Sequence, residues 1–553
     1  MVNQTELDDV QDHLYMRADD HLSELDSMLK IQSIPNDPKF EQQNKQIINR
    51  LAERLTELEF DVELVEIKAK EDQATHYVIF ASYFSTPAKN VMLIYGHVDV
   101  PPVGEMDPWL HPPFQLTEVK GMLYGRGLTS SKGPILCWIQ AIDAWFSKTG
   151  DLPVNIKIII DSDKSSGTQT LRDLIGSRKD FFRSVDLLVG RTNLWIAEKV
   201  PMLTTSHSGY VYFELEVKAN RGRKSKDSDI EANCGCKPDR DPMAELCLLM
   251  NTLTDTKKGL LVEGLKRHVL PVTQHDWDIF CKAEVGVQEY KEITGAQGIP
   301  HERSQPEFLK NRWCMPSLSF HSVVQSHTVS HRDFNMPTQI VARFSVKLVP
   351  DQSIKYASFV VRDHLDQAYI RLKCKHRAYL RVVDQLSPLN EARNAPFNLA
   401  ACRAYESVYN VRAAIPATVN VCMPIMNELR RYCMSNVQVV GLPFCSVHVQ
   451  PNQVNESFTK DEYLKNLELF TTFLFEVALV PSECKCTEIP DFCFEKGKST
   501  DTDFIRMMEP RPHNTHVLYE IDEKEIDRTK PVDDALPNVK NILLGKDKAD
   551  DTL

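Results

Sequence analysis

The sequence lacks the features of secreted, membrane-spanning and disulfide-rich proteins. No stretch reaches the roughly 18 consecutive apolar residues that span a bilayer, and the start, MVNQTELDDVQDHL, has neither the basic nor the apolar segment of a secretory signal. The 14 cysteines are scattered, apart from Cys234-Gly-Cys236 and Cys484-Lys-Cys486, and they provide no C-x-x-C pairs at the matching spacing of a zinc ribbon. We therefore expect a soluble, cytoplasmic protein whose thiols stay reduced.

An excess of basic charge is also absent. The chain has 65 Lys and Arg residues against 77 Asp and Glu residues, for a net charge of -12, so we expect neither general nucleic-acid binding nor attachment to a membrane surface. The basic run at residues 221–226 is therefore interpreted as a solvated loop. A length of 553 residues, of which 42% are hydrophobic, predicts a globular protein, with roughly two to four domains at the usual domain size.

The first part of the chain alternates between helical and strand patterns. Apolar residues recur at helical spacing in residues 6–32 and 41–58, and residues 91–100 form an apolar run that stops at a Pro-Pro pair, as a buried strand does. The alternation continues as helix, strand, helix and strand through residues 134–147, 154–160, 169–177 and 185–189. This order predicts an α/β fold with a mostly parallel sheet between helices, and a ligand site beyond the carboxyl ends of the strands.

A different pattern begins near Tyr210. The segments YVYFELEVKAN, RWCMPSLSFHSV and QIVARFSVKLV read as antiparallel strands, with helices expected after Asp241 and Ser353, which together predict an inserted α+β domain. Thr459-x-x-Glu462 is a capping box that opens a later amphipathic helix. We therefore divide the chain into residues 1–207 and 386–480 of the α/β domain, an inserted domain of residues 208–385, and a charged extension of residues 481–553, which we expect to be loosely packed or to wrap the surface.

The densest chemical signal lies where the strand within residues 91–100 ends. His97 leaves the strand and Asp99 follows two residues later, so that the carboxylate can orient the imidazole of a metal ligand. A glycine-rich segment, GMLYGRGLTSSKGP, then opens a helix. It does not match a phosphate-binding loop, because that loop ends in Gly-Lys-Ser/Thr and here Lys132 precedes Gly133.

These motifs carry a resemblance to a known family. YGHVDVPP, DPW, PPFQLTEVKGMLYGRG, SKGP, LPVNIKI, RKDFF, RWCMPSLSFH, FSVKLVPD and the late His448 with Asn455-Glu456 occur in the order found in the cytosolic non-specific dipeptidases and carnosinases, which the chain resembles over about residues 10–480. The resemblance implies a three-layer catalytic-type domain with an inserted dimerisation lid. It also implies two zinc or manganese ions, a homodimer or a heterodimer with an active relative, and a peptide-like small molecule as ligand.

Several residues that the resemblance assigns to catalysis are replaced. The metal-bridging Asp is Ser130, the general-base Glu is Lys164, a zinc-binding Glu is Ser165, and a zinc-binding Asp is Thr192. Among the five zinc ligands that the resemblance implies, only His97 and His448 are kept, with Asp99 as the residue that orients His97. The positions that supply a charge of -4 in the family supply +1 here.

This change in charge decides the predicted function. Catalytic zinc sites normally have three protein ligands and an open position, and a charged Lys cannot take a proton from water. We therefore expect no bound metal cofactor and a catalytically inactive family member that acts as a scaffold, a subunit partner or a ligand binder. An active dipeptidase with a rebuilt site, or a metal-free hydrolase built on Lys164 and the nearby serines, are the alternatives. Lys164 is expected to pair with Asp99 or Asp163 and to fill the former metal pocket.

Three further positions correspond to substrate-contacting segments of the family. Glu231 stands where the resemblance places a His donated by the partner subunit. Lys347 replaces an Arg expected near the substrate carboxylate, which keeps the charge but loses the two-pronged donor geometry of the guanidinium. Cys422 lies where the family has a glycine-rich segment.

Overall fold

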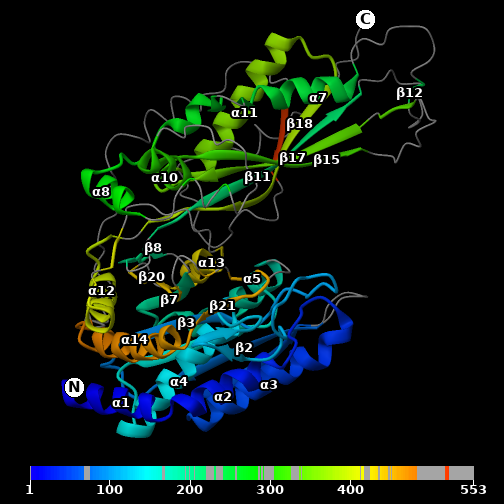
Figure 1. Ribbon diagram of the computed structural model, residues 1–553. Helices are drawn as coiled ribbons and strands as arrows, with labels where there is room; N and C mark the ends of the chain where they lie inside the picture. The colour runs from blue at the N-terminus through cyan, green and yellow to red at the C-terminus, as the bar shows by residue number, and fades with distance from the viewer. Residues whose placement is uncertain are drawn as a thin grey trace, which may run out of the picture.

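The chain folds into two bodies, each built on its own sheet, with the N-terminus beside α1 of the lower body (Figure 1). The computed structural model describes residues 2–67, 75–164, 168–192, 195–197, 200–204, 206–219, 230–231, 241–255, 258–283, 287, 291, 304–325, 335–337, 339–390, 392–411, 413–415, 424–433, 436–445, 449, 451–482 and 517–521.

The lower body contains a six-stranded, mostly parallel sheet. Its strands, in spatial order, are β1 (Asp61–Ile67), β2 (His76–Tyr83), β6 (Asn155–Asp161), β3 (Val91–His97), β7 (Leu187–Thr192) and β20 (Gln438–Pro443). The four strands from β6 to β20 pair in parallel, whereas β1 and β2 add an antiparallel edge. The predicted α/β class is confirmed, and the carboxyl ends of β6, β3 and β7 lie side by side.

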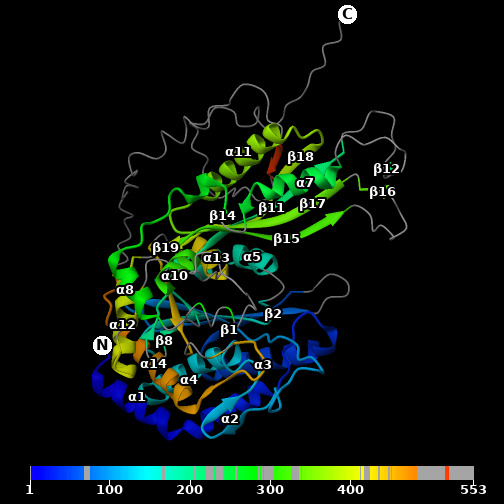
Figure 2. The ribbon, with the colours of Figure 1, turned by 45° about the horizontal axis from the view of Figure 1, so that its top comes forward.

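Helices cover both faces of this sheet, because successive apolar residues of its buried strands point to opposite sides. Ile94 and Ile158 belong to one core cluster, whereas Leu93 and Ile159 belong to the other. The first face carries α1 (Gln4–Met16), α2 (Ala18–Leu29), α3 (Glu41–Glu57), α4 (Lys132–Thr149), α12 (Pro396–Tyr409) and α14 (Lys460–Ala478). The second face carries α5 (Thr168–Ser177), α6 (Lys179–Phe182) and α13 (Pro424–Tyr432), of which α5 and α13 lie between the two sheets in both ribbon views (Figures 1 and 2).

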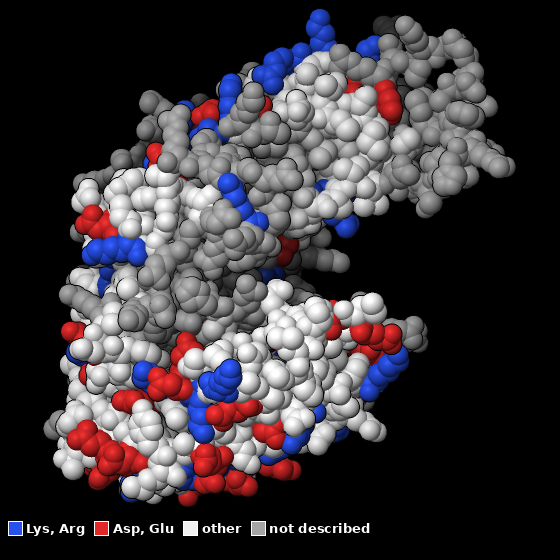
Figure 3. All heavy atoms as spheres, viewed as in Figure 1, with Lys and Arg blue, Asp and Glu red and all other residues white. Residues whose placement is uncertain are grey.

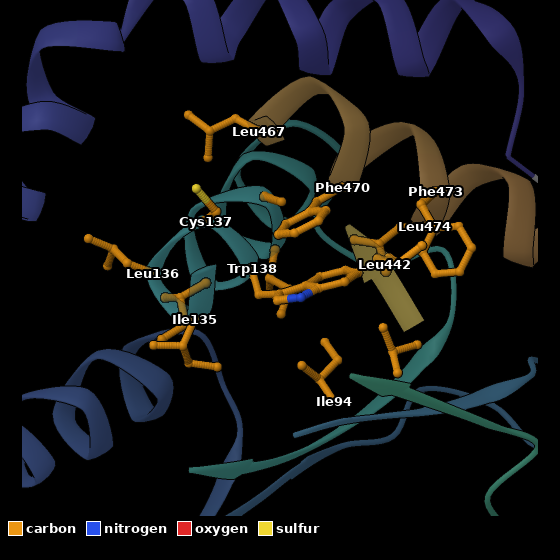
Figure 4. Packing of buried hydrophobic residues seen from close by; sticks show 14 of the residues in the cluster. Ile94, Ile135, Leu136, Cys137, Trp138, Leu442, Leu467, Phe470, Phe473 and Leu474 are labelled. Carbon is orange, nitrogen blue, oxygen red and sulfur yellow. The ribbon is translucent and has the colours of Figure 1, made fainter. Parts of the chain in front are cut away.

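Aromatic packing joins α4 to α14 over the first face. The ring of Trp138 stacks on Phe470 at a centroid distance of 4.1 Å and an interplanar angle of 10°, and Phe473 lies at its edge (Figure 4). Ile94 of β3 lies below this stack in the same cluster. Residues more than 300 positions apart thus fix α4, and with it the segment that precedes α4.

The upper body is a five-stranded sheet covered on one face. Its strands, in spatial order, are β15 (Ser317–Gln325), β17 (Gln339–Leu348), β11 (Gly209–Lys218), β18 (Arg377–Leu386) and β22 (Val517–Ile521). The apolar face packs on α7 (Pro242–Asn251) and α11 (Ile354–Leu372), with Phe213 and Phe344 stacked at its centre. Two further helices, α8 (Gln274–Lys282) and α10 (Gln305–Cys314), pack against each other beside it.

Short pairings complete the fold. A ribbon of β21 (Ser457–Thr459), β5 (Met122–Tyr124) and β4 (Thr117–Val119) brings the segment before α14 next to the segment before α4. Where the chain passes between the bodies, β10 (Ser206–His207) pairs with β19 (Leu389–Asn390). The other short elements are η1 (Pro38–Phe40), η2 (Glu263–Lys266), β8 (Trp195–Ala197), β9 (Val200–Pro201), β12 (Ile230–Glu231), β13 (Thr254–Asp255), β14 (Gly259–Leu260) and β16 (Asn335–Met336).

Three details differ from the predicted elements. The helix expected over residues 6–32 is broken at Arg17, whose backbone leaves the helical region at φ -103° and ψ 18°. The strand expected from Arg312 begins only at Ser317, because Ser304 caps α10 and the helix runs through Cys314. Part of the C-terminal extension forms β22. Within the described ranges, no helix combines the length and the apolar character needed to cross a membrane.

Candidate functional site

The predicted His-Asp pair forms at the carboxyl end of β3. His97 Nδ1 lies 2.7 Å from Asp99 Oδ1, and both side chains are largely buried. His97 Nε2 is buried and has no hydrogen-bond partner among the described residues. Burial lowers the pKa of His97, and the positive charges of Lys164 and Arg191 add to this effect, whereas Asp99 raises the pKa. The pair therefore favours a neutral imidazole that donates its Nδ1 proton to Asp99 and leaves the Nε2 lone pair open.

The turn before α4 is held by a carboxylate from a distant part of the chain. Glu456 is 1% exposed, and its two oxygens accept from the backbone N–H groups of Gly127, Thr129 and Ser130 at 2.8–3.0 Å and from the Thr129 hydroxyl at 2.7 Å. A Cβ at Gly133 would lie 1.8 Å from the carbonyl oxygen of Leu128. Only glycine, which has no side chain, therefore fits at this position of the turn. The position of Ser130 is therefore fixed by hydrogen bonds to its own backbone and to that of its neighbours.

The two serines in this turn leave their hydroxyl groups unused. Ser130 is 0% exposed and Ser131 is 2% exposed, and neither Oγ atom has a hydrogen-bond partner in the described part of the chain. Ser131 is the N-cap of α4, yet its side chain makes no capping bond. The structure therefore gives no hydrogen bond from either serine to Lys164, as a Ser-Lys pair would need.

Lys132, the first residue of α4, is fully buried. The sequence analysis considered this residue only as part of the glycine-rich segment and did not predict its burial. Its Nζ donates to the carbonyl oxygen of Ile31, and the side chain is 0% exposed. Burial lowers the pKa of Lys132 to about 7, and the nearby Glu456 carboxylate opposes this shift. Lys132 and Glu456 thus form a buried polar group behind the turn.

The expectation that Lys164 pairs with Asp99 or Asp163 is wrong. The residue follows β6 and is partly exposed, and among the described residues no carboxylate lies within ion-pair distance of its Nζ. Partial burial and the guanidinium of Arg191 lower the pKa of Lys164, whereas Asp99 and Asp161 raise it. Asp99 contacts His97 instead.

The network around Asp161 was not predicted from the sequence. His76 Nε2 lies 2.5 Å from Asp161 Oδ1, the Tyr95 hydroxyl donates to Asp161 Oδ2 at 3.1 Å, and the backbone N–H of Asp163 donates to Asp161 Oδ1 at 2.9 Å. Burial lowers the pKa of His76, but Asp161 outweighs it, so the pKa is raised. The network fixes the end of β6, from which Lys164 extends.

Arg191, at the end of β7, is a second cation of this region. Its Nη1 donates to the carbonyl oxygen of Thr129 at 2.5 Å, which ties β7 to the turn before α4. Burial lowers the pKa of Arg191, and Cys445 and Glu456 raise it. The ends of β3, β6 and β7 therefore bring His97, Lys164 and Arg191 into one region, as predicted for the carboxyl ends of parallel strands.

The other predicted site residues fall into two groups. Ser165, His448 and Cys422 lie outside the described residues. Thr192 pairs with Pro443 through the backbone of β7 and β20, and Glu231 pairs with Asn335 between β12 and β16.

Lys347 lies on β17 in the upper body. Its Nζ donates to the carbonyl oxygen of Arg312 at 2.7 Å. Burial lowers the pKa of Lys347 to about 8. The contact to a residue of α10 gives this ammonium a structural partner, and its expected role beside a substrate carboxylate stays a prediction.

The described residues do not fit a pair of zinc ions. The open Nε2 of His97 is a suitable ligand, but Ser130 offers a neutral hydroxyl and Lys164 an ammonium that repels a cation. Within the described ranges, no group of three or more His, Cys, Asp or Glu side chains is arranged to hold a metal ion.

Known proteins are similar to this chain in sequence and in fold. The human Beta-Ala-His dipeptidase is 30% identical over 402 residues, which cover 72% of this chain and 77% of the relative. The Cys-Gly metallodipeptidase DUG1 of Saccharomyces cerevisiae is 28% identical over 338 residues, covering 60% and 69%. The crystal structure of human carnosine dipeptidase 1 superposes with a TM-score of 0.67 at 29% identity, covering 85% of this chain and 98% of that one.

The two-sheet fold and the His97–Asp99 pair at the end of β3 are thus those of the metallopeptidase class. The model of peptidase family M20/M25/M40 matches residues 93–476, and the chain belongs to this family. Its similarity is to the dipeptidases within the family.

Proposed function

We propose that this chain is a catalytically inactive member of the dipeptidase family, which keeps the fold as a scaffold, a subunit partner or a binder of peptide-like molecules. One observation carries the proposal. At the ends of β3 and β6, the intact His97–Asp99 pair shares its surroundings with the Lys164 side chain, which has no ion-pair partner among the described residues.

The chemistry of peptide hydrolysis supports this proposal. A metallodipeptidase needs a group that takes a proton from the attacking water, and acidic ligands that offset the repulsion between paired cations. In the alignment implied by the family motifs, Lys164 holds the position of the base and Ser130 that of the bridging carboxylate. An ammonium at the first position and a hydroxyl at the second perform neither task.

The retained geometry of His97 favours one alternative, an active dipeptidase with a rebuilt metal site. His97 Nε2 is open, and Asp99 orients the ring as it would for a metal ligand. Residues beyond the described ranges, His448 among them, would have to supply the other ligands. The experiment below separates this alternative from the inactive protein.

We also propose that the protein is a cytoplasmic homodimer assembled through residues 208–385. The support is the β15 edge of the upper sheet, where the side chains of Phe320, Val323 and Val324 are 39%, 48% and 50% exposed. An exposed apolar edge strand is a template for pairing with another chain. A second copy would cover this strand.

The test of inactivity compares the chain with a reverted form. The wild-type protein, supplied with Zn²⁺ or Mn²⁺, is expected not to hydrolyse Cys-Gly or β-Ala-His. The fourfold variant Ser130→Asp, Lys164→Glu, Ser165→Glu, Thr192→Asp is expected to bind zinc, because it restores the acidic groups around His97. Metal-dependent turnover by the wild type that is lost in His97→Ala would support the rebuilt site instead. A folded revertant without zinc would contradict the alignment on which the proposal rests.

A further inference from the structure

The C-terminal extension supplies an edge strand to the upper sheet. Residues Val517–Ile521 form β22, which pairs in parallel with Ala378–Val382 of β18 (the red strand in Figure 1). The strand also contacts α11, the helix that covers the same sheet. A segment more than 130 residues from β18 in sequence therefore completes the order β15-β17-β11-β18-β22.

This strand lies beyond the part of the chain that defines the family. The family model's match ends at residue 476, and β22 begins at Val517. Human carnosine dipeptidase 1 covers 85% of this chain with 98% of its own length. We therefore treat β22 as an addition to the family fold.

Without β22, β18 would be the second edge of the sheet. An edge strand presents unpaired N–H and C=O groups along its length and accepts any extended chain with a suitable pattern. Ala378 and Leu380 are buried in the core of the upper body, at 1% and 0% exposure, so this edge adjoins an apolar layer. The register places Val517 opposite Ala378 and Tyr519 opposite Leu380. Apolar residues of β22 therefore stand opposite the buried residues of β18.

We propose that β18 is a strand-binding edge whose occupant is the chain's own segment Val517–Ile521, and that this segment keeps other extended peptides from adding to the sheet. The pairing is parallel and five residues long, which makes it a weak ladder that a competing strand can displace. Occupation of the β18 edge directs a second copy of the chain to β15, the opposite edge.

A disulfide trap in the full-length chain tests where the occupant comes from. Under mild oxidation, Ala378→Cys combined with Val517→Cys is expected to form an intrachain bond, identified by mass spectrometry of the cross-linked peptides and absent from the wild type. Ala378→Cys combined with Ile521→Cys is the matched control and is expected to cross-link at least tenfold less, because Ile521 pairs with Val382. The same bond in a product of doubled mass would show that the strand comes from a second copy, and equal cross-linking of both pairs would overturn the assigned register.

A competing peptide tests whether the edge accepts a strand. A fluorescent peptide with the sequence NTHVLYEIDEK, residues 514–524, is expected to bind the full-length Tyr519→Pro variant at least tenfold more tightly than the wild type, because proline removes a ladder donor and frees the edge. A scrambled peptide and the Ile526→Pro variant are the controls. Equal affinity for the wild type and Tyr519→Pro, or binding to neither, would overturn the proposal.

Discussion

Replacing Glu456 by Gln should destabilise the lower body, because this carboxylate serves four donors at once. Its oxygens accept from the N–H groups of Gly127, Thr129 and Ser130 and from the Thr129 hydroxyl, at 2.7–3.0 Å. The amide of Gln has the same size but only one oxygen. That oxygen can keep the bonds to Thr129 and Ser130, and the NH₂ group then faces the N–H of Gly127, which is also a donor.

The expected cost follows from these contacts. A hydrogen bond to a charged group contributes about 1.5–3 kcal/mol, roughly twice as much as a neutral one, and a buried donor left unpaired costs about 1–3 kcal/mol. The unpaired N–H of Gly127 and the three weakened bonds together lower the free energy of unfolding by about 3–5 kcal/mol, given that such contributions are not additive.

Urea denaturation followed by intrinsic fluorescence measures this change as a lower midpoint at unchanged slope. Glu406→Gln is the control, since Glu406 lies exposed on α12, and it should shift the stability by less than about 0.5 kcal/mol. A change below about 1 kcal/mol for Glu456→Gln would refute the reasoning.

Two further predictions follow from buried or bridging charges. The folded state holds the pKa of Lys132 at about 7, so the unfolded chain binds more protons between this pH and the ordinary Lys pKa, and stability rises with pH. In urea titrations, the free energy of unfolding of the wild type, relative to that of Lys132→Met, should rise by about 1 kcal/mol per pH unit from pH 7.5 to 9.5. A difference in unfolding free energy that stays constant over this range would contradict the predicted sign. Asp384 of β18 accepts from Tyr210 at 2.6 Å and pairs with Arg172 of α5 at 3.3 Å, so Asp384→Asn should loosen the contact between the bodies and increase the radius of gyration in small-angle X-ray scattering, whereas the exposed Asp180→Asn should not.

The sequence predicted the strands β3, β6 and β7 of the lower sheet, because each is a largely apolar run, as expected for a strand buried on both faces. The helix of α4 and the N-cap of α14 followed from local signals, and Thr459 makes its predicted capping box with Glu462. The His97–Asp99 pair was predicted for the same reason, since two residues on a strand end are necessarily close. Local spacing decides these features.

The missed features depend on contacts between distant segments. His76 and Asp161 are 85 residues apart, and Glu456 reaches a turn 326 residues earlier, so no window of sequence contains either contact. The pairing expected between Lys164 and Asp99 is not formed, because Asp99 contacts His97 instead. The strand β22 was missed because five residues within a charged extension carry little periodic signal.

The face drawn in Figure 3 is hollowed between the two bodies. Metal binding distinguishes the inactive protein proposed above from an active dipeptidase with a rebuilt site. Elemental analysis of the protein, purified without chelators and dialysed after exposure to Zn²⁺ and Mn²⁺, tests this point most directly. We expect far less than two ions per chain, unchanged in the His97→Ala variant. Two tightly bound ions per chain, lost in His97→Ala, would contradict it.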